Sequence, residues 1–237
     1  MSDTILEVKS LSCKGQDGNV IISEVNFAVR ENDVVIIQGK SGSGKSTLLK
    51  CLAHLNLYDG EVFYHGETPK KLGIPLFRTR VTYVPQRPSL LPGTPRDFIR
   101  AISGFSARTG SGIKKDVLYN EIAERSTGIG KAWDVEEGLW DREWSNLSGG
   151  EAQRIALATA FGCDTAEVLL LDEPTSALDA ESGSQVEKFI VDEVRNSESA
   201  LKAVVWITHS DEQGGRVGTR YLRISEGLCD EEAAPDV

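Results

Sequence analysis

One segment of this chain, Gly39 to Ser46, constrains the fold more than any other. It fits the pattern G-x-x-x-x-G-K-[S/T], the loop that wraps the phosphates of a nucleoside triphosphate. The β-branched run 34–37 predicts a preceding strand that is buried on both faces, as in a parallel sheet. Leucines at helical spacing predict a following helix from Ser46 to Asn56. A strand-to-helix turn is the context that this pattern requires, so the sequence predicts an α/β fold with a nucleotide site.

The chemistry of this loop follows from its residue types. Glycines at 39, 42 and 44 let the backbone curl around an anion, and the start of the helix adds partial positive charge. Lys45 brings a full charge to the outer phosphates, and the Ser46 hydroxyl is suited to ligate Mg²⁺. The residues expected around the nucleotide are Gly39, Lys40, Ser41, Gly42, Ser43, Gly44, Lys45, Ser46 and Thr47. The alternative, a flexible glycine-serine loop with an isolated lysine, does not explain the flanking strand and helix.

Two adjacent carboxylates close a second buried strand. The aliphatic run 168–171 is followed by Asp172 and Glu173. Ligands of open α/β sheets bind at the carboxyl ends of the strands. We expect Asp172 to belong to the Mg²⁺ shell and Glu173 to polarise the attacking water, because phosphoryl transfer needs positioning and charge compensation. A solvated acidic turn is the alternative, and the phosphate loop upstream argues against it.

The segment Leu147–Glu151 reads Leu-Ser-Gly-Gly-Glu and supplies a third motif. Ser148 and Glu151 fit the capping-box pattern S-x-x-E, which predicts a helix after them. A capped helix start with two glycines is itself an anion site. Together with the phosphate loop, in this order, the segment resembles the nucleotide-binding domain of an ABC (ATP-binding cassette) ATPase. The resemblance covers the chain from about Ile5 to Gly227.

The resemblance implies roles for three further residues. Gln86, in Tyr-Val-Pro-Gln, matches the glutamine loop, where it would contact Mg²⁺ or the attacking water. Asp179 matches the aspartate of the D-loop, a nucleotide-site element. His209 follows the predicted strand 203–207 and matches the switch histidine, although a lone histidine after a strand is more often structural. The implied catalytic residues are Glu173, His209, Lys45 and Gln86, and the implied Mg²⁺ ligands are Ser46, Gln86 and Asp172.

A paired arrangement is also implied by the resemblance. Ser148, Gly149 and Gly150 would act in trans, reaching the γ-phosphate held by the phosphate loop of a second copy. We therefore expect a homodimer or a paired ABC cassette that binds ATP, and a separately encoded transmembrane permease that ATP hydrolysis drives. The alternative function is that of a soluble, non-transport ABC ATPase acting in assembly or repair. The sequence contains neither a long coiled coil nor a second cassette, which would have favoured that alternative.

The whole chain, 1–237, is expected to be a single nucleotide-binding domain. Alternating segments between Ile5 and Arg30, together with 61–64, predict an antiparallel N-terminal β subdomain beside the mainly parallel sheet of a P-loop NTPase core. The resemblance places an inserted helical subdomain at about 87–146.

Finer expectations concern this insertion and the end of the chain. Helical patterns surround 97–102 and 113–125, and the Gly/Ser-rich stretch 103–112 predicts a loop between them. Residues 229–237 are expected to form a flexible acidic tail. Three neighbouring tryptophans read as core of the helical subdomain or as a docking surface for a membrane subunit: Trp133, Trp140 and Trp144.

Composition bounds the cellular setting. Lys+Arg is 26 and Asp+Glu is 36, and the net charge of −10 argues against a surface that coats nucleic acid. The scattered cysteines, with no C-x-x-C, predict reduced thiols. No apolar stretch approaches the length that spans a bilayer. We therefore expect a cytoplasmic protein that associates peripherally with a membrane through a partner subunit, and no nucleic-acid partner.

One position departs from the family pattern. Most members carry an aromatic residue shortly after the first strand, stacked on adenine, and Cys13 is assigned to that position here because no aromatic lies between Leu6 and Asn26. Cysteine offers no π-face, so we expect a weakly held base and weak discrimination between ATP and GTP.

Overall fold

The computed structural model describes residues 3–88, 92–109 and 113–234. Its main sheet runs in the order β5-β6-β7-β3-β8-β9, and a second sheet runs β2-β1-β4. The strands are β1 (Thr4–Lys14), β2 (Val20–Arg30), β3 (Val34–Gln38), β4 (Asp59–Tyr64), β5 (Val81–Val84), β6 (Val168–Asp172), β7 (Ala203–Ile207), β8 (Arg220–Ser225) and β9 (Leu228–Glu232).

Helices connect the strands and form a separate layer. The helices are α1 (Lys45–Leu52), α2 (Pro69–Leu72), α3 (Ile74–Arg80), α4 (Pro95–Ser103), α5 (Ser106–Thr109), α6 (Lys115–Ala132), η2 (Glu137–Asp141), η3 (Trp144–Asn146), α7 (Gly149–Gly162), α8 (Ala180–Arg195) and α9 (Asp211–Val217). Strands β5, β6, β7, β3 and β8 are parallel, while the β1–β2, β1–β4 and β8–β9 pairs are antiparallel. The predicted α/β class with an antiparallel N-terminal sheet is confirmed.

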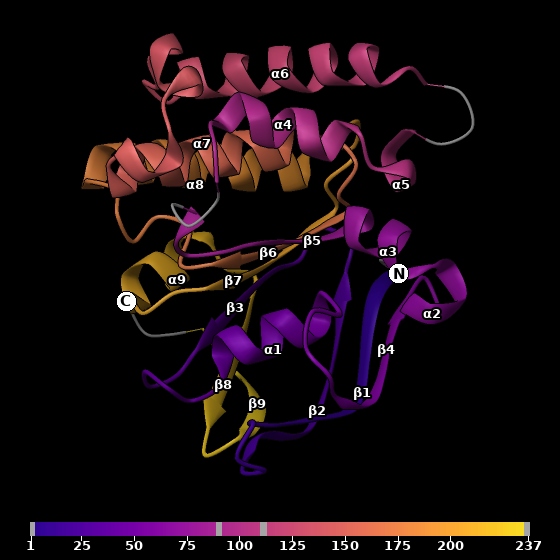
Figure 1. Cartoon of the computed structure of the whole chain (residues 1–237). Helices are drawn as coiled ribbons and strands as arrows, with labels where there is room; N and C mark the ends of the chain where they lie inside the picture. The colour runs from indigo at the N-terminus through magenta and orange to yellow at the C-terminus, as the bar shows by residue number, and fades with distance from the viewer. Residues whose placement is uncertain (1–2, 89–91, 110–112, 235–237) are drawn as a thin grey trace.

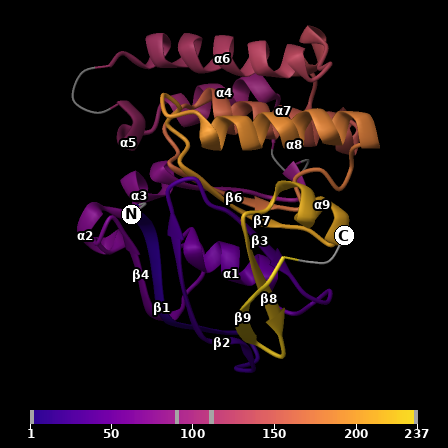
Figure 2. The same ribbon diagram turned by 180° about the vertical axis from the view of Figure 1, so that it is seen from behind.

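Both faces of the main sheet are covered, as the unbroken aliphatic runs predict. Val34 and Ile36 of β3 pack into one hydrophobic cluster with α4, α6, α7 and α8. Val35 and Ile37 pack into the other, with α1 and the small sheet. Figures 1 and 2 show the same two layers, with α7 and α8 on one side of the sheet and α1 on the other. The sheet is therefore a rigid platform whose carboxyl edge carries the polar residues described below.

The helical layer between β5 and β6 has its own aromatic core. The tryptophan side chains at 133, 140 and 144 are buried, and Trp133 packs edge-on against Phe161 and Phe189. The core interpretation of these tryptophans is therefore confirmed. Thr94 and Asp97 form a capping box at the start of α4, with Pro95 in its first turn.

The helix after the phosphate loop ends earlier than predicted. It stops at Leu52, because His54 takes a left-handed conformation with φ of 54°. The N–H of His54 donates to the Cys51 carbonyl at 2.8 Å, and that of Leu55 donates to the Lys50 carbonyl at 2.7 Å. This pair of bonds is a Schellman C-cap, and it turns Leu55 out of the helix although the leucine spacing continues through it.

Two other expectations are corrected. Residues 228–232 form the edge strand β9 rather than a flexible tail, because Arg220 and Arg223 of the neighbouring strand pair with Glu231 and Glu232. The expected loop 103–112 contains the short helix α5 at 106–109. Residues 110–112 of that loop and 235–237 of the tail lie outside the described residues. Within the described residues, no helix has the length and apolar character needed to cross a membrane.

Candidate active site

The phosphate loop leaves β3 and enters α1 through two positions that only glycine satisfies. Gly39 has φ of 147°, and a Cβ there would clash with the carbonyl oxygen of Ile224 on β8. Gly44 has φ of 101°, is the N-cap of α1, and would press a Cβ against Ile21 and Ile22 of β2. The loop is thus held between β8 and the small sheet, in a curled conformation that suits an anion site.

Lys45 is held inside the loop that it is predicted to serve. Its Nζ donates to the carbonyl oxygens of Gly39 at 2.8 Å and Lys40 at 2.9 Å. Burial lowers the pKa of Lys45, and the nearby charges of Glu173 and Asp172 oppose that shift. A nucleotide phosphate would supply a direct counter-charge to this buried ammonium, which fits the predicted role.

Asp172 connects the phosphate loop to two strands. Its Oδ1 accepts a 3.0 Å hydrogen bond from the Ser46 hydroxyl, and its Oδ2 accepts one of 2.9 Å from Tyr83 on β5. Burial raises the pKa of Tyr83, with Asp172 adding to the effect, so the phenol remains a neutral donor. Hydroxyl and carboxylate oxygens are suitable ligands for Mg²⁺, which also binds water and phosphate oxygens. The residues present therefore fit the predicted metal.

Glu173 is placed between two side chains from distant parts of the chain. Gln86 donates from Nε2 to one carboxylate oxygen at 2.7 Å, and His209 Nε2 lies 3.0 Å from the other. Glu173 itself is left-handed, with φ of 48°, and its N–H donates to the Ile207 carbonyl at 3.1 Å. The three predicted catalytic residues beyond Lys45 thus meet at one point, where a water could be oriented for attack. The amide nitrogen of Gln86 faces Glu173, so its role as a Mg²⁺ ligand stays a prediction.

The Ser-Gly-Gly segment lies apart from this cluster in the single chain. Ser148 and Glu151 form the predicted capping box at the start of α7. A Cβ on Gly150 would approach the carbonyl oxygen of Ala177 to 3.0 Å, so the segment packs on the loop that follows Glu173. Among the described residues, no hydrogen bond joins 148–150 to the phosphate loop. Action of this segment in trans remains a prediction.

Asp179 is engaged with its own helix. Its carboxylate caps α8 by accepting from the N–H groups of Glu181 and Ser182 and from the Ser182 hydroxyl. The Ser182 N–H is the main reason that the pKa of Asp179 is lowered. Asp179 would therefore contribute to nucleotide binding while its carboxylate caps α8.

Sequence reasoning assigned no role to three polar residues of the site. Tyr83 holds Asp172, as described above. Gln153 on α7 is buried, donates from Nε2 to the Glu173 carbonyl at 2.9 Å and accepts from the Ala177 N–H at 3.1 Å. Gln213 on α9 bonds Thr175 in the loop after Glu173. Their signal in the sequence is weak, because each is a single polar side chain whose partners lie far away along the chain.

The assignment of Cys13 to the base-stacking position is wrong. Its side chain is only 4 % exposed and packs in the cluster beneath the small sheet. Its thiol donates to the Leu57 carbonyl at 3.3 Å, pointing into the protein. A buried side chain presents no surface to a base, so weak base discrimination stays a prediction that no longer rests on this residue.

Comparisons with known proteins find related ATP-binding proteins. The family model described as ABC transporter matches residues 22–176. The phosphate import ATP-binding protein PstB of Shewanella denitrificans is 35% identical over 94% of this chain and 82% of its own length, and that of Pseudoalteromonas translucida is 33% identical over 94% and 80%. The solved dimeric ATP-binding cassette MJ0796, bound to ADP and Pi, is 26% identical and superposes with a TM-score of 0.81 over 98% of this chain and 100% of that one.

Proposed function

The chain belongs to the ABC transporter family and is an ABC-type ATPase, and we propose that it powers a separate membrane permease with the residues assembled above. The position of Glu173 carries the proposal, because its carboxylate contacts Gln86 and His209. Glu173 also directly follows Asp172 in the chain, and Asp172 accepts a hydrogen bond from Ser46. The alternative of a non-transport ATPase is set aside, because the matching family is one of transporters.

In the proposed reaction, each residue has a separate task. The loop amides and Lys45 bind the β- and γ-phosphates of ATP. Ser46 and Asp172 hold Mg²⁺, which when bound neutralises charge developing on the phosphates. Glu173 orients the attacking water and accepts its proton, while His209 and Gln86 keep the carboxylate aimed at that water. The proton transfer therefore takes place at a Glu173 carboxylate oxygen.

The proposed active unit is a pair of chains. Ser148 and Gly150 share no hydrogen bond with their own phosphate loop, and a capped helix start with two glycines is suited to bind an anion supplied from outside. The solved relative MJ0796 is a dimer, which supports pairing. ATP between two such chains would contact the phosphate loop of one and the Ser-Gly-Gly segment of the other.

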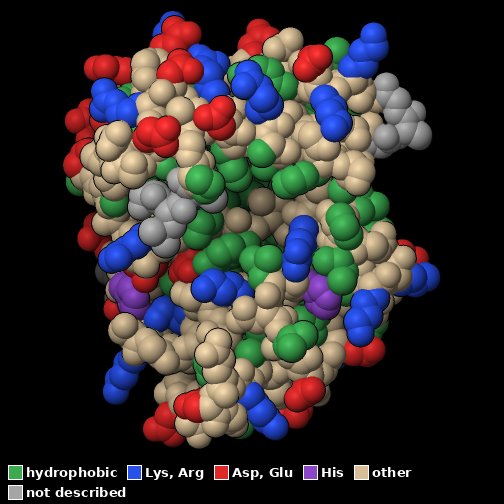
Figure 3. Space-filling model, viewed as in Figure 1, with side chains coloured by type: hydrophobic (Ala, Val, Ile, Leu, Met, Phe, Trp, Pro, Cys, Tyr) green, Lys and Arg blue, Asp and Glu red, His purple; other side chains and the backbone are tan. Residues whose placement is uncertain are grey.

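A surface for the permease is available beside the catalytic residues. An apolar cavity of about 110 Å³ lies between β5 and the helical layer, lined among others by Tyr83, Pro85, Phe98 and Ala160. Figure 3 shows hydrophobic side chains gathered around a hollow between these two layers. A permease segment bound there would contact β5, the strand that leads to Gln86. Through Gln86, transport would be coupled to hydrolysis.

The named relatives supply a direction and a cargo to test. Both PstB proteins are named as phosphate import subunits, so we propose import, with inorganic phosphate as the first cargo to test. The experiment is co-expression with the candidate permease, co-purification in detergent and reconstitution in vesicles. Mg²⁺- and ATP-dependent accumulation of ³²P-phosphate, absent with Glu173→Gln, supports the proposal. Hydrolysis without accumulation of phosphate overturns the cargo, and no hydrolysis in either the free or the permease-bound protein overturns the function.

A further inference from the structure

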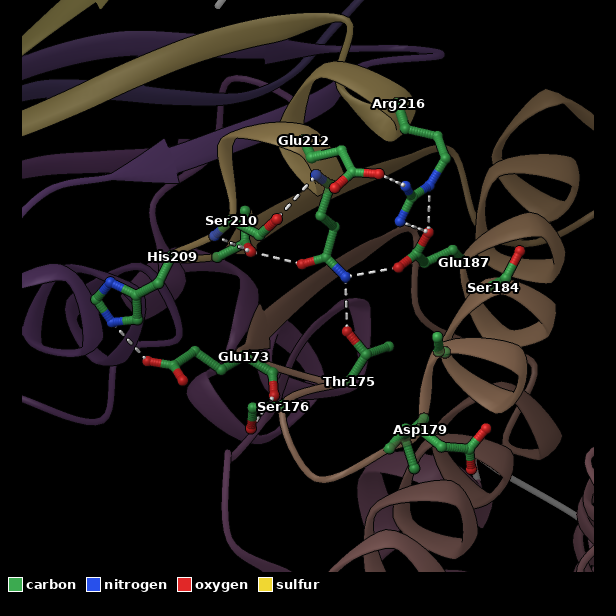
Figure 4. A pocket seen from close by; sticks show the side chains of 15 residues that line it. Glu173, Thr175, Ser176, Asp179, Ser184, Glu187, His209, Ser210, Glu212 and Arg216 are labelled. Atoms are coloured by element: carbon green, nitrogen blue, oxygen red, sulfur yellow. Dashed lines mark hydrogen bonds and ion pairs between the residues drawn. The ribbon is translucent and has the colours of Figure 1, made fainter. Parts of the chain in front are cut away.

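A partly buried polar network lies behind the catalytic cluster and centres on Gln213 of α9. Its Nε2 donates to Thr175 Oγ1 and to Glu187 Oε1, both at 2.7 Å, and its Oε1 accepts from the Thr208 hydroxyl. Figure 4 shows Thr175 and Glu187 converging on this point from the loop after Glu173 and from α8. The amide of Gln213 thus uses both donors and its oxygen, so its orientation is determined by the network.

The same residue grips both neighbours of the predicted switch histidine. Thr208 donates to the side chain of Gln213, and the Gln213 N–H donates to Ser210 Oγ at 3.1 Å. Ser210 in turn donates its N–H to Thr208 Oγ1 at 3.1 Å. The Gln213 side chain therefore holds Thr208 directly, whereas the bond to Ser210 comes from the Gln213 backbone N–H and is the N-cap bond of α9.

His209 itself depends on that support. Its side chain is 47% exposed and, within residues 3–88, 92–109 and 113–234, makes a polar contact with Glu173 alone. An exposed side chain with a single partner takes its direction from its backbone. Glu187 anchors the network to α8, because Glu187 is only 5% exposed and Arg216 pairs with its carboxylate at 2.7 Å.

We propose that the Gln213 side chain is a positioning element that holds His209 in its catalytic direction by fixing the preceding Thr208 against Thr175 and α8. The inference rests on the proposed function, because it explains how His209, one of the proposed catalytic residues, is held in place. The proposed effect of Gln213 on hydrolysis passes through the direction of His209.

The test measures Mg²⁺-ATP hydrolysis and nucleotide affinity in Gln213→Leu, which keeps the bulk and removes the amide. Because small misplacements of a catalytic group cost roughly 10- to 100-fold in rate, kcat should fall by that factor while KM for ATP stays within about twofold. Lys188→Gln is the matched control. Lys188 follows Glu187 on α8 with an exposed side chain, and this variant should hydrolyse ATP as wild type does.

A double-variant comparison separates positioning from a general loss of structure. In a His209→Ala background, Gln213→Leu should cause no further fall in kcat, because the residue that it positions is absent. Additive losses, a wild-type kcat in the single variant, or an equal loss of ATP affinity would each overturn the proposal.

A second pair of variants keeps the test decisive if Gln213→Leu does not fold. Thr175→Val removes one acceptor of Gln213 and should lower kcat, whereas Thr175→Ser keeps the hydroxyl and should restore it. Equal activity of the two overturns the inference. If wild type itself hydrolyses no ATP, the proposed function fails; if wild type is active and the Gln213 variant equally so, only this inference fails.

Discussion

Gln86 donates a 2.7 Å hydrogen bond to the carboxylate of Glu173 and so joins the segment after β5 to the end of β6. The chain enters the helical layer shortly after Gln86, at Pro95. A movement of that layer would carry Gln86 with it and change the partner of the residue proposed to activate water. We propose this bond as the physical route by which a permease bound at the helical layer would control hydrolysis.

The first prediction concerns Glu173→Gln. The amide keeps the shape of the side chain but accepts no proton, so hydrolysis should fall by roughly 100-fold or more while ATP still binds. Single-turnover phosphate release and equilibrium ATP titration measure the two properties. Hydrolysis at the wild-type rate would show that Glu173 does not activate the water.

The second prediction concerns Lys45→Ala. Hydrogen bonds to a charged group contribute about 1.5–3 kcal/mol, so losing the ammonium should weaken ATP binding by roughly 10- to 100-fold. Lys50→Ala, on the same helix, is the control and should bind ATP normally. Equal affinities in calorimetric titrations of the two variants would contradict the assignment of Lys45.

The sequence predicts a site motif well where the residues beside the motif also predict the strand or helix that holds it. The phosphate loop and the Asp172–Glu173 pair lie at strand ends that their neighbours specify, so both were predicted together with the sheet that carries them. The bond from Tyr83 to Asp172 spans 89 residues, and no local periodicity signals it. The network around Gln213 escaped prediction for the same reason.

The errors also have local physical causes. Leucine spacing continues past Leu52, but the left-handed His54 ends the helix. The acidic run 230–232 resembled a solvated end, and only the two arginines on β8 make it a strand. In both places a backbone conformation or a partner from another element outweighs the one-dimensional pattern.

The third prediction is a pH dependence at that strand. The hydrogen bond from Arg220 is the main cause that lowers the pKa of Glu231, so the ionised carboxylate stabilises the folded state. This contribution is present above the ordinary glutamate pKa and is lost as pH falls through the lowered folded value. Glu231→Gln should reduce Tm by roughly 1–3 °C at pH 7, because the pair is partly exposed, and by progressively less as the pH falls below the ordinary glutamate pKa. A Tm difference that persists at acid pH would contradict this.

The fourth prediction corrects the expectation for Cys13. Because its side chain is buried, Cys13→Tyr overpacks the cluster and should lower the free energy of unfolding by about 1–3 kcal/mol. Cys13→Val, closer in size and suited to a strand, should cost less. Urea denaturation measures both, and titration of ATP and GTP tests whether wild type discriminates weakly. A folded tyrosine variant with tightened ATP affinity would show that the side chain reaches the base after all.

The fifth prediction tests sites shared between two chains. Lys45→Ala disables the phosphate loop but keeps a working Ser-Gly-Gly segment, whereas Ser148→Phe disables that segment but keeps a working phosphate loop. Each variant alone should therefore be inactive. A mixed pair contains one site built from the intact halves of both, and mixing the two inactive proteins should therefore restore hydrolysis. If each site were complete within one chain, mixing would restore nothing. Glu173→Gln with Mg²⁺-ATP should in addition elute as a dimer in size-exclusion chromatography, because unhydrolysed γ-phosphate bridges the two chains, and a monomer at high protein concentration would count against the shared site.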